Sequence, residues 1–467
     1  MINKLTFITI LSFTFLFLIG CTKNDNIPLK TQLSQLPTTK PVDNKINRPT
    51  EVRPLPGKLN NIPMINSNSP EWLRDEGILL STFSSTEKAF PHAHLGYPLS
   101  GKFELFDHHY IINQPESKTI YLGFLVHNPN KKAISLNISE AASNLIIAVP
   151  NSKSKNPLDG SRASDAILKG VRDSYFPSQI TLQPNEYKLI MNKSIDTLGL
   201  PRNLNGRSSH IRFESKEIGS NTPALINFAS LAMYGKKDSN GKIQPPTLTQ
   251  WRQLLEKGDL AKPRDKTPTP PQKTEGNLIY SRVAGIQQGT KWQTDLTNSG
   301  KNYLKIPQDG KSLSFVISTI RKSTLGTNQI QSANLLTRYP DTAYEAHGNY
   351  GVHYDLTAPL FNPYSQPKTV TVAIETSLKS ENNQVLSFDS KSDSSAVFSG
   401  LVRLRYLDDA SLPTESYITV KQSRGQVVKP LLTLNLKPQE TRKVRVDFLY
   451  PPDSTPPQVL TFTTNPN

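Results

Sequence analysis

Histidine side chains offer the clearest metal chemistry in this sequence. His92 and His94 are two residues apart, and His108 lies further along the chain in an adjacent His-His pair. Because side chains at positions i and i+2 of a strand point to the same side, His92 and His94 could face one metal ion, with His108 brought in from a neighbouring strand. Zinc or copper would suit these ligands, and no other cofactor is predicted. Pro91 and Gly96 place the first pair in a loop, so surface or turn histidines are the alternative interpretation.

A second candidate site is the segment 338–351, where Tyr, His, Asn and Gly are densest. Tyrosines on glycine-flexed loops are good contacts for sugars or proteins, because a rigid apolar ring carries a polar tip. The alternative is that the tyrosines pack beneath a long loop and the glycines serve turns. The candidate binding residues are Tyr339, Asp341, Tyr344, His347, Asn349 and Tyr350.

The sequence predicts no catalytic residue, and an enzyme is the less favoured class. There is no Gly-x-Ser-x-Gly motif of the kind that presents a hydrolase serine. A glycosidase needs two carboxylates about 5 to 10 Å apart, which spacing along the chain cannot show. An envelope polysaccharide or peptidoglycan hydrolase therefore stays as an alternative function.

The one cysteine among the 467 residues, Cys21, follows an apolar run at residues 5–19. That run is too short for an ordinary membrane span. Together with Lys4, which precedes it, the run predicts a signal peptide over residues 1–20. The ending Leu-Ile-Gly-Cys at residues 18–21 resembles the bacterial lipobox, and the resemblance implies acylation of the Cys21 thiol and cleavage before it. A plain secretory peptide or an uncleaved anchor is the alternative. A single cysteine also excludes intramolecular disulfides and four-cysteine zinc sites.

These features predict a lipoprotein anchored in a cell-envelope membrane and facing the periplasm or the cell exterior. Residues 21–50 are polar and interrupted by proline, so we expect a flexible tether there. The net charge of +16 is scattered, without a dense basic run, so nucleic acid is not an expected partner. Anionic lipid headgroups or acidic envelope polysaccharide suit it better, unless the charge only keeps the surface soluble. The sequence makes no prediction of the oligomeric state.

The elements that must position these residues are strands. The 37 prolines outnumber the 24 glycines, which argues against long helices and favours a turn-rich all-β fold. Asn128-Pro129 and Asn362-Pro363 each precede a run of alternating apolar residues, and each half then carries a Leu-x-Pro-x-Glu turn, at 182–186 and 436–440. The repeated pair of turns resembles bacterial immunoglobulin-like and related β-sandwich modules, which implies two β-sandwich lobes with short helices and long loops.

Composition predicts the domain boundaries. Residues 51–261 are expected to form the first β-rich lobe, residues 262–275 a proline-rich linker, and residues 276–467 the second lobe. A short helix is expected after Thr249, its cap, with Gly258 as its stop. Alternation through residues 443–449 predicts a strand that closes a sheet and carries no active site.

Several longer phrases are similar to an uncharacterised family of exported proteins, known mainly from cyanobacteria and labelled as a domain of unknown function. The resemblance covers residues 51–460 and implies no activity, cofactor or catalytic residue. The phrases are Glu-Val-Arg-Pro-Leu-Pro-Gly at 51–57, Glu-Gly-Ile-Leu-Leu-Ser-Thr at 76–82, Tyr-Pro-Asp-Thr-Ala-Tyr at 339–344, His-Gly-Asn-Tyr-Gly at 347–351 and Tyr-Pro-Pro-Asp at 450–453.

Taken together, the sequence predicts a lipid-anchored envelope protein with a binding or structural role. The alternatives from other classes are the hydrolase and a periplasmic metal-binding protein that uses the three histidines.

Overall fold

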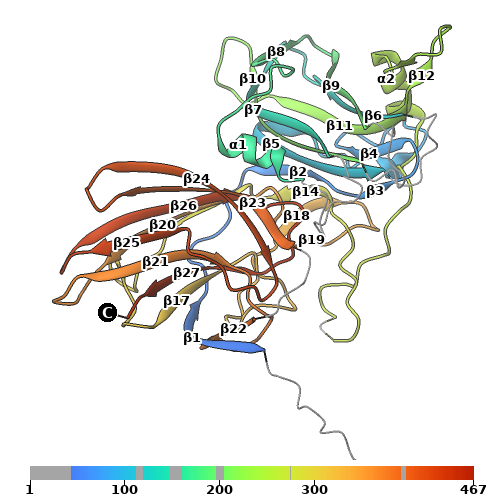
Figure 1. The fold of residues 1–467 in the computed structure, drawn as a ribbon. Coiled ribbons are helices and arrows are strands. Elements are labelled where there is room, and N and C mark those ends of the chain that lie inside the picture. Colours follow the sequence, from blue (N-terminus) through green and yellow to red (C-terminus); the bar gives the residue numbers. More distant parts are fainter. Residues whose placement is uncertain are drawn as a thin grey trace, which may run out of the picture. The chain divides into compact units, whose positions relative to one another are not determined.

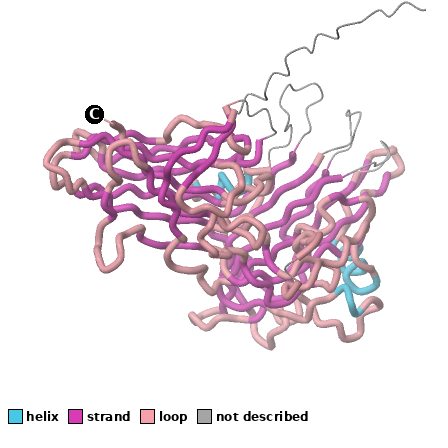
Figure 2. The backbone as a smooth tube through the Cα atoms, turned by 90° about the horizontal axis from the view of Figure 1, so that it is seen from below, coloured by secondary structure: helices cyan, strands magenta, loops and turns pink. Residues whose placement is uncertain are grey.

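The computed structural model describes residues 44–111, 119–146, 160–195, 205–273, 275–390 and 396–466. Cys21, the predicted signal peptide and most of the expected tether lie outside the described residues. Residues from Asn44 onward form one compact unit. Strands dominate that unit, and α1 and α2 are the two α-helices among the described residues, so the predicted all-β class is confirmed (Figures 1 and 2).

The elements follow one another along the chain in two groups. The first group is β1 (Lys45–Arg53), β2 (Pro63–Ser67), β3 (Trp72–Leu73), β4 (Gly77–Ser81), the 3-10 helix η1 (Pro91–Ala93), β5 (Leu99–Ile111), β6 (Ile120–His127), β7 (Ile134–Ile146), α1 (Arg162–Leu168), β8 (Gln179–Leu182), β9 (Tyr187–Ile195), β10 (Gly206–Glu217), β11 (Leu225–Tyr234), β12 (Lys236–Lys237), β13 (Ile243–Gln244) and α2 (Leu248–Lys257). The second group is β14 (Ala284–Gln288), β15 (Lys291–Asp295), β16 (Leu304–Lys305), β17 (Ser312–Ile317), β18 (Ala333–Arg338), β19 (Glu345–Ala346), β20 (His353–Phe361), β21 (Lys368–Glu375), β22 (Val385–Asp389), β23 (Ala396–Leu407), β24 (Pro413–Ser423), β25 (Leu432–Leu436), β26 (Thr441–Leu449) and β27 (Gln458–Thr464).

The two halves repeat one pattern of strand pairing. In the first half β5, β10, β7 and β8 are neighbours in that order, with β2 parallel to β5. In the second half β17, β27, β21 and β25 are neighbours in the same order, with β1 parallel to β17. A facing pair completes each half, β6 with β9 and β20 with β26, both antiparallel. The halves are therefore two copies of the same sandwich framework.

The repeated Asn-Pro turns explain why both halves fold alike. The Asn128 amide donates to the carbonyls of residues 132, 182 and 183, and its side-chain oxygen accepts from the backbone of residue 130. The Asn362 amide donates to the carbonyls of residues 366, 436 and 437, and accepts from residue 364. Each asparagine thus ties its own turn to the Leu-x-Pro-x-Glu turn of the same half, and a buried amide satisfies backbone groups that no strand pairs.

Each framework carries an insertion at the same place, and the two insertions touch. Between β7 and β8 the first half contains α1, and between β21 and β25 the second half contains β22 to β24. Ile167 and Leu168 of α1 pack on Leu401 of β23 and Leu449 of β26. The Asp165 carboxylate accepts a hydrogen bond from the backbone of Leu401 at 3.2 Å.

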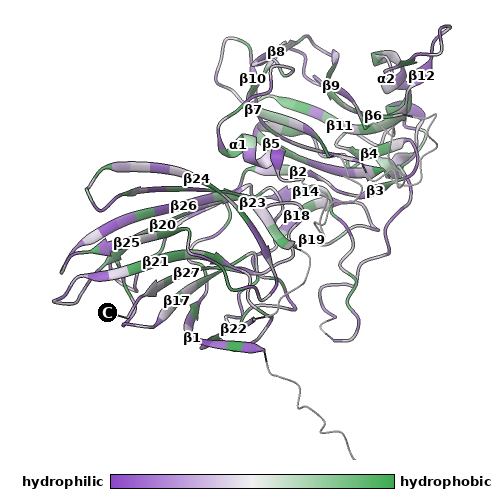
Figure 3. Cartoon of the chain, in the orientation of Figure 1, coloured by the Kyte–Doolittle hydropathy of each residue, from purple (hydrophilic) through white to green (hydrophobic). Residues whose placement is uncertain are grey.

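Two large apolar cores hold the strands together, one mainly in each half. Figure 3 colours the strands by hydropathy and shows hydrophobic and hydrophilic residues mixed along them. The first core includes Trp251 of α2, and a Cβ on Gly123 would lie 2.7 Å from its ring, so the helix docks where β6 has no side chain. The α2 cap is Thr247, which forms a capping box with Gln250. The expected cap at Thr249 was wrong by half a turn, because the earlier threonine has glutamine three residues after it.

Strand pairing crosses the boundaries predicted from composition. β1 begins at Lys45, inside the expected tether, and pairs with β17 and β22 of the second half. β14 and β18 come after the expected linker, yet β14 pairs with β2 of the first half. The expected linker also contacts the folded unit, because Arg264 forms an ion pair with Asp341 at 2.8 Å.

Candidate functional site

The three candidate metal ligands have separate surroundings. The exposed His92 lies 2.7 Å from Asp259, and the buried His94 lies 2.8 Å from the Ser81 hydroxyl. His108 is buried within β5, and burial lowers the pKa of His108 to about 3 and that of His94 to about 4. Across the described ranges, no three His, Cys, Asp or Glu side chains form a group that could hold a metal ion. The geometry therefore gives the metal prediction no support.

Three of the candidate binding residues, the buried Tyr339 and Asn349 and the half-buried Tyr350, hold loops together. The Tyr339 hydroxyl donates to the Ala93 carbonyl at 3.0 Å and accepts from the backbone of Ser81 at 2.9 Å. Tyr350 donates to a carbonyl after β26 at 2.7 Å, and the Asn349 amide bonds the backbone near β18. The segment 338–351 does contact Ala93, between His92 and His94, but it does so through the buried hydrogen bond from Tyr339. Packing beneath a loop, the alternative interpretation, describes these residues better than a binding surface.

The other three candidates also have partners within the chain. Asp341 pairs with Arg264, and the Tyr344 ring lies 3.7 Å from the Arg338 guanidinium. His347 packs on a tyrosine ring at 4.2 Å, and burial lowers the pKa of His347 to about 4. Tyr344 and His347 line a hollow of about 20 Å³, which has room for a water molecule but not for a sugar ring.

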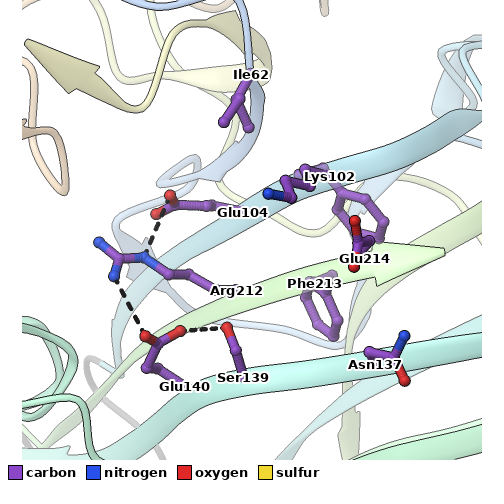
Figure 4. A pocket seen from close by; sticks show the side chains of 10 residues that line it. Ile62, Lys102, Glu104, Asn137, Ser139, Glu140, Arg212, Phe213 and Glu214 are labelled. Atoms are coloured by element: carbon purple, nitrogen blue, oxygen red, sulfur yellow. Dashed lines mark hydrogen bonds and ion pairs between the residues drawn. The ribbon is translucent and has the colours of Figure 1, made fainter.

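A larger hollow of about 390 Å³ lies on the outer face of β5, β10 and β7, and we call it the sheet groove (Figure 4). Its walls alternate positive and negative side chains. The residues that line it are Ile62, Lys102, Phe103, Glu104, Asn137, Ser139, Glu140, Arg212, Phe213 and Glu214.

The strand register places the charges of the sheet groove. Arg212 of β10 stands directly opposite Glu104 of β5. The alternate positions, Phe103 and Phe213, point into the core and stack at 4.9 Å. Because side chains of a strand alternate between faces, burying these phenylalanines forces the charged pair outward.

Glu104 is an ionised acceptor within the sheet groove. Its Oε2 lies 3.0 Å from His210 Nε2, its Oε1 lies 3.3 Å from Arg212 Nε, and Arg212 Nη1 lies 3.7 Å from Glu140. Burial alone would raise the pKa of Glu104, but the His210 hydrogen bond and the Arg212 charge outweigh it and lower the pKa. A carboxylate in this state accepts hydrogen bonds and is a poor proton donor at neutral pH, so the groove does not favour general acid catalysis.

Facing this region is a second polar cluster, on β20, β23 and β26. Asp447 is fully buried, and its oxygens lie 3.1 Å from His353 Nε2, 2.6 Å from Arg403 Nη2 and 3.1 Å from Arg405 Nη2. Burial opposes its ionisation, but the hydrogen bonds from His353 and Arg403 hold the pKa of Asp447 well below its usual range. The carboxylate therefore fixes two guanidinium groups whose outer edges remain in contact with solvent.

One strand away, Asp355 repeats the arrangement. It is buried on β20, and its oxygens lie 2.6 Å from Lys291 Nζ and 2.5 Å from Arg445 Nε. Burial would raise the pKa of Asp355, and the hydrogen bonds from Arg445 and Lys291 lower it instead. We call the four cations above these two buried carboxylates, Lys291, Arg403, Arg405 and Arg445, the arginine face.

The sheet groove and the arginine face adjoin. Thr290, the residue before β15, helps to lower the pKa of Glu104, and the charge of Arg212 lowers the pKa of the buried His353 beyond what burial does. Together they form one polar region: the arginine face supplies guanidinium donors, and the sheet groove beside it carries Glu104, Glu140 and Glu214 with Lys102 and Arg212. Such donors suit carboxylates, sulfates and phosphates, because a guanidinium pairs with them through two parallel hydrogen bonds.

Sequence reasoning missed this surface, although it left a signal. Val402-Arg403-Leu404-Arg405 and Val444-Arg445-Val446-Asp447 alternate apolar and charged residues, which places every charge on one face of two strands. The expectation that residues 443–449 close a sheet is wrong, because β26 lies between β20 and β23 in the middle of its sheet. A central strand with charged outward positions is a stronger pointer to a site than scattered tyrosines.

Comparison with known families agrees with the resemblance in the sequence. The model of a family described as a protein of unknown function, DUF3370, matches residues 50–464. The chain belongs to the DUF3370 family. No curated protein matches the chain at a significant level. Within the part of the chain that the structure describes, no helix of this family member is both long enough and apolar enough to cross a membrane.

Proposed function

We propose that this protein is a lipid-anchored component of the cell envelope that binds acidic polysaccharide on the arginine face. The observation that carries the proposal is the excess of cations over carboxylates on this face: four cationic side chains lie above two buried carboxylates, Asp355 and Asp447. The excess positive charge attracts a polyanion, while the buried acids hold the guanidinium groups in fixed orientations.

The anchor rests on the sequence. Cys21, at the end of a short apolar run, supports acylation and attachment to a membrane. Detergent partitioning of the mature protein tests this part. We expect Cys21→Ser to move the protein to the soluble fraction, and an unchanged distribution would contradict the anchor without touching the binding site.

Affinity for polygalacturonate, compared with uncharged dextran of the same length, tests the binding. We expect the double substitution Arg403→Gln/Arg405→Gln to weaken binding by about tenfold or more, since charge-assisted hydrogen bonds contribute about 1.5 to 3 kcal/mol each. The control Lys236→Gln/Lys237→Gln removes the same charge from exposed positions on β12. Equal weakening in both variants would mean that net charge alone attracts the polymer and would refute the proposed site.

Two further measurements distinguish loss of the binding site from misfolding and from binding to lipid. Arg405→Gln alone leaves Arg403 on Asp447 and keeps the face assembled, so it should still lose affinity while circular dichroism stays unchanged. Vesicles of phosphatidylglycerol, compared with phosphatidylcholine, separate an anionic headgroup from a polysaccharide. Tight binding to the vesicles with none to polygalacturonate would replace the proposed ligand by lipid.

A further inference from the structure

β24 is an edge strand with unusual length and regularity. It is the last strand of the sheet with the order β15-β20-β26-β23-β24, and among the described strands it pairs with β23 alone (Figure 1). It has 11 residues, and its one register shift against β23 lies at the far end, between residues 396 and 398. The outer backbone groups of an edge strand can pair with another chain. β24 has Pro413 at its first position and Lys421 near its end, and the positions between them form a regular ladder with β23.

The charges on β24 make the strand complementary to itself. Glu415 and Lys421 are its two charged residues, and they stand at equal distances on either side of Ile418. If a second β24 runs antiparallel with Ile418 opposite Ile418, each Glu415 faces the Lys421 of the other copy. Directly opposed side chains have their Cβ atoms about 4.5 to 5.5 Å apart, and opposite charges there stabilise the pair.

Other registers lose this match. Moving the centre to Thr419 places Glu415 opposite Ser423, and moving it to Tyr417 places Lys421 opposite Pro413. A parallel pairing in register would place Glu415 opposite Glu415. A single two-fold arrangement thus places both pairs of opposite charges face to face, and two-fold symmetry is the commonest symmetry of homodimers.

The position of β24 beside the arginine face connects this edge to the rest of the site. Tyr417 pairs with Arg403 and Glu415 pairs with Arg405 on β23, so the outer face of β24 continues the arginine face. Tyr417 is 38% exposed, which is high for a large ring on a strand. A dimer through this edge covers part of that ring and brings two arginine faces onto one continuous sheet.

We propose that β24 pairs with β24 of a second copy of this chain, antiparallel and centred on Ile418, to form a two-fold dimer. The inference does not depend on the polysaccharide proposal, although such a dimer would present two binding faces to one polymer. Its failure and the failure of the proposed ligand are distinguishable, because the dimer is measured without any polysaccharide.

Cysteine cross-linking in the purified protein tests the register. Ile418→Cys places the two new thiols opposite each other, and mild oxidation should link the copies. The control Ser416→Cys lies on the same face of β24, but the pairing places its copies four positions apart, about 13 Å at 3.3 Å per residue, beyond the reach of a disulfide. Equal cross-linking of both variants, or none with Ile418→Cys, would overturn the proposal.

A charge exchange tests the pairing itself. We expect Glu415→Lys to weaken dimerisation by about tenfold in analytical ultracentrifugation, because two attractive pairs become repulsive. The double variant Glu415→Lys/Lys421→Glu restores both pairs and should return the dimer to within about twofold of the native chain. A native chain that stays monomeric, or a double variant no better than the single one, would refute the pairing.

Discussion

Replacing Asp447 with asparagine tests whether one buried carboxylate organises the arginine face. Asp447 is fully buried and bonded to His353, Arg403 and Arg405. Asparagine keeps the size but removes the charge, so the two guanidinium groups repel each other over a neutral amide. Breaking a buried ion pair costs about 3 to 5 kcal/mol, and we expect about 3 kcal/mol because both arginines retain access to water.

The measurement is urea unfolding of the purified protein, followed by near-ultraviolet circular dichroism. The midpoint should fall while the slope m stays unchanged, because the surface exposed on unfolding is the same. Asp295→Asn, at an exposed position on β15, makes the same chemical change and should shift the free energy of unfolding by less than about 0.5 kcal/mol. If Asp447→Asn shifts it no more than this control, the carboxylate does not organise the face and the reasoning fails.

The pH dependence gives an independent check. The pKa of Asp447 is lower in the folded chain than in the unfolded one, so its contribution to stability is present above the ordinary value of about 3.9 and is lost as pH falls through the folded pKa. The stability difference between native chain and Asp447→Asn should therefore be constant from pH 7 down to about pH 5 and shrink below about pH 4. A difference that grows on acidification would contradict this cause.

Two further predictions concern the repeated turns and the buried histidine of β5. Asn128→Ala and Asn362→Ala should each lower the free energy of unfolding by about 2 to 3 kcal/mol in urea, because each substitution leaves backbone carbonyls without a hydrogen-bond donor. His109 is buried; burial lowers its pKa, but the charge and hydrogen bond of Asp107 prevail and raise it. A raised pKa gives stability that is fully present below the ordinary value of about 6.5 and is lost as pH rises through the folded pKa, so His109→Gln should flatten the stability profile on that side.

A specific result would contradict each of these two predictions. Asn240 lies in the exposed turn between β12 and β13, so Asn240→Ala should change stability far less than either turn variant. Equal losses from all three asparagine variants would mean that the repeated turns have no special role. A His109→Gln variant with the native pH profile would mean that this histidine is neutral in the folded chain.

The sequence predicted local features well because they depend on neighbouring residues. Asn128 and Asn362 are followed by proline, which restricts the backbone before it, so both turns could be recognised from composition. The cap of α2 was misplaced for the same kind of reason, since two threonines compete and the one with Gln250 three residues later forms the capping box. Boundaries set by one or two residues are the part of a local prediction most easily wrong.

The residue types of the predicted site do not decide its exposure, because exposure is not a local property. Tyr339 and Tyr350 have the residue types of a binding surface, yet Tyr339 is buried and Tyr350 is half-buried where the segment after β18 meets other strands. His92, His94 and His108 are close in sequence, but separate hydrogen bonds hold them in separate places. Proximity along a chain says little about proximity in a sheet, where neighbours are often a hundred residues apart.

The sequence by itself determined the all-β class, the duplicated Asn-Pro turns and membership of a family of unknown function, because backbone preferences and apolar alternation act within a few residues. The tertiary structure alone decided that Arg403, Arg405 and Arg445 meet over Asp355 and Asp447. Those residues come from three strands, and their meeting depends on which strands pair and in which register. Burial in low dielectric then turns ordinary surface charges into a fixed cationic face, and no stretch of sequence contains that effect.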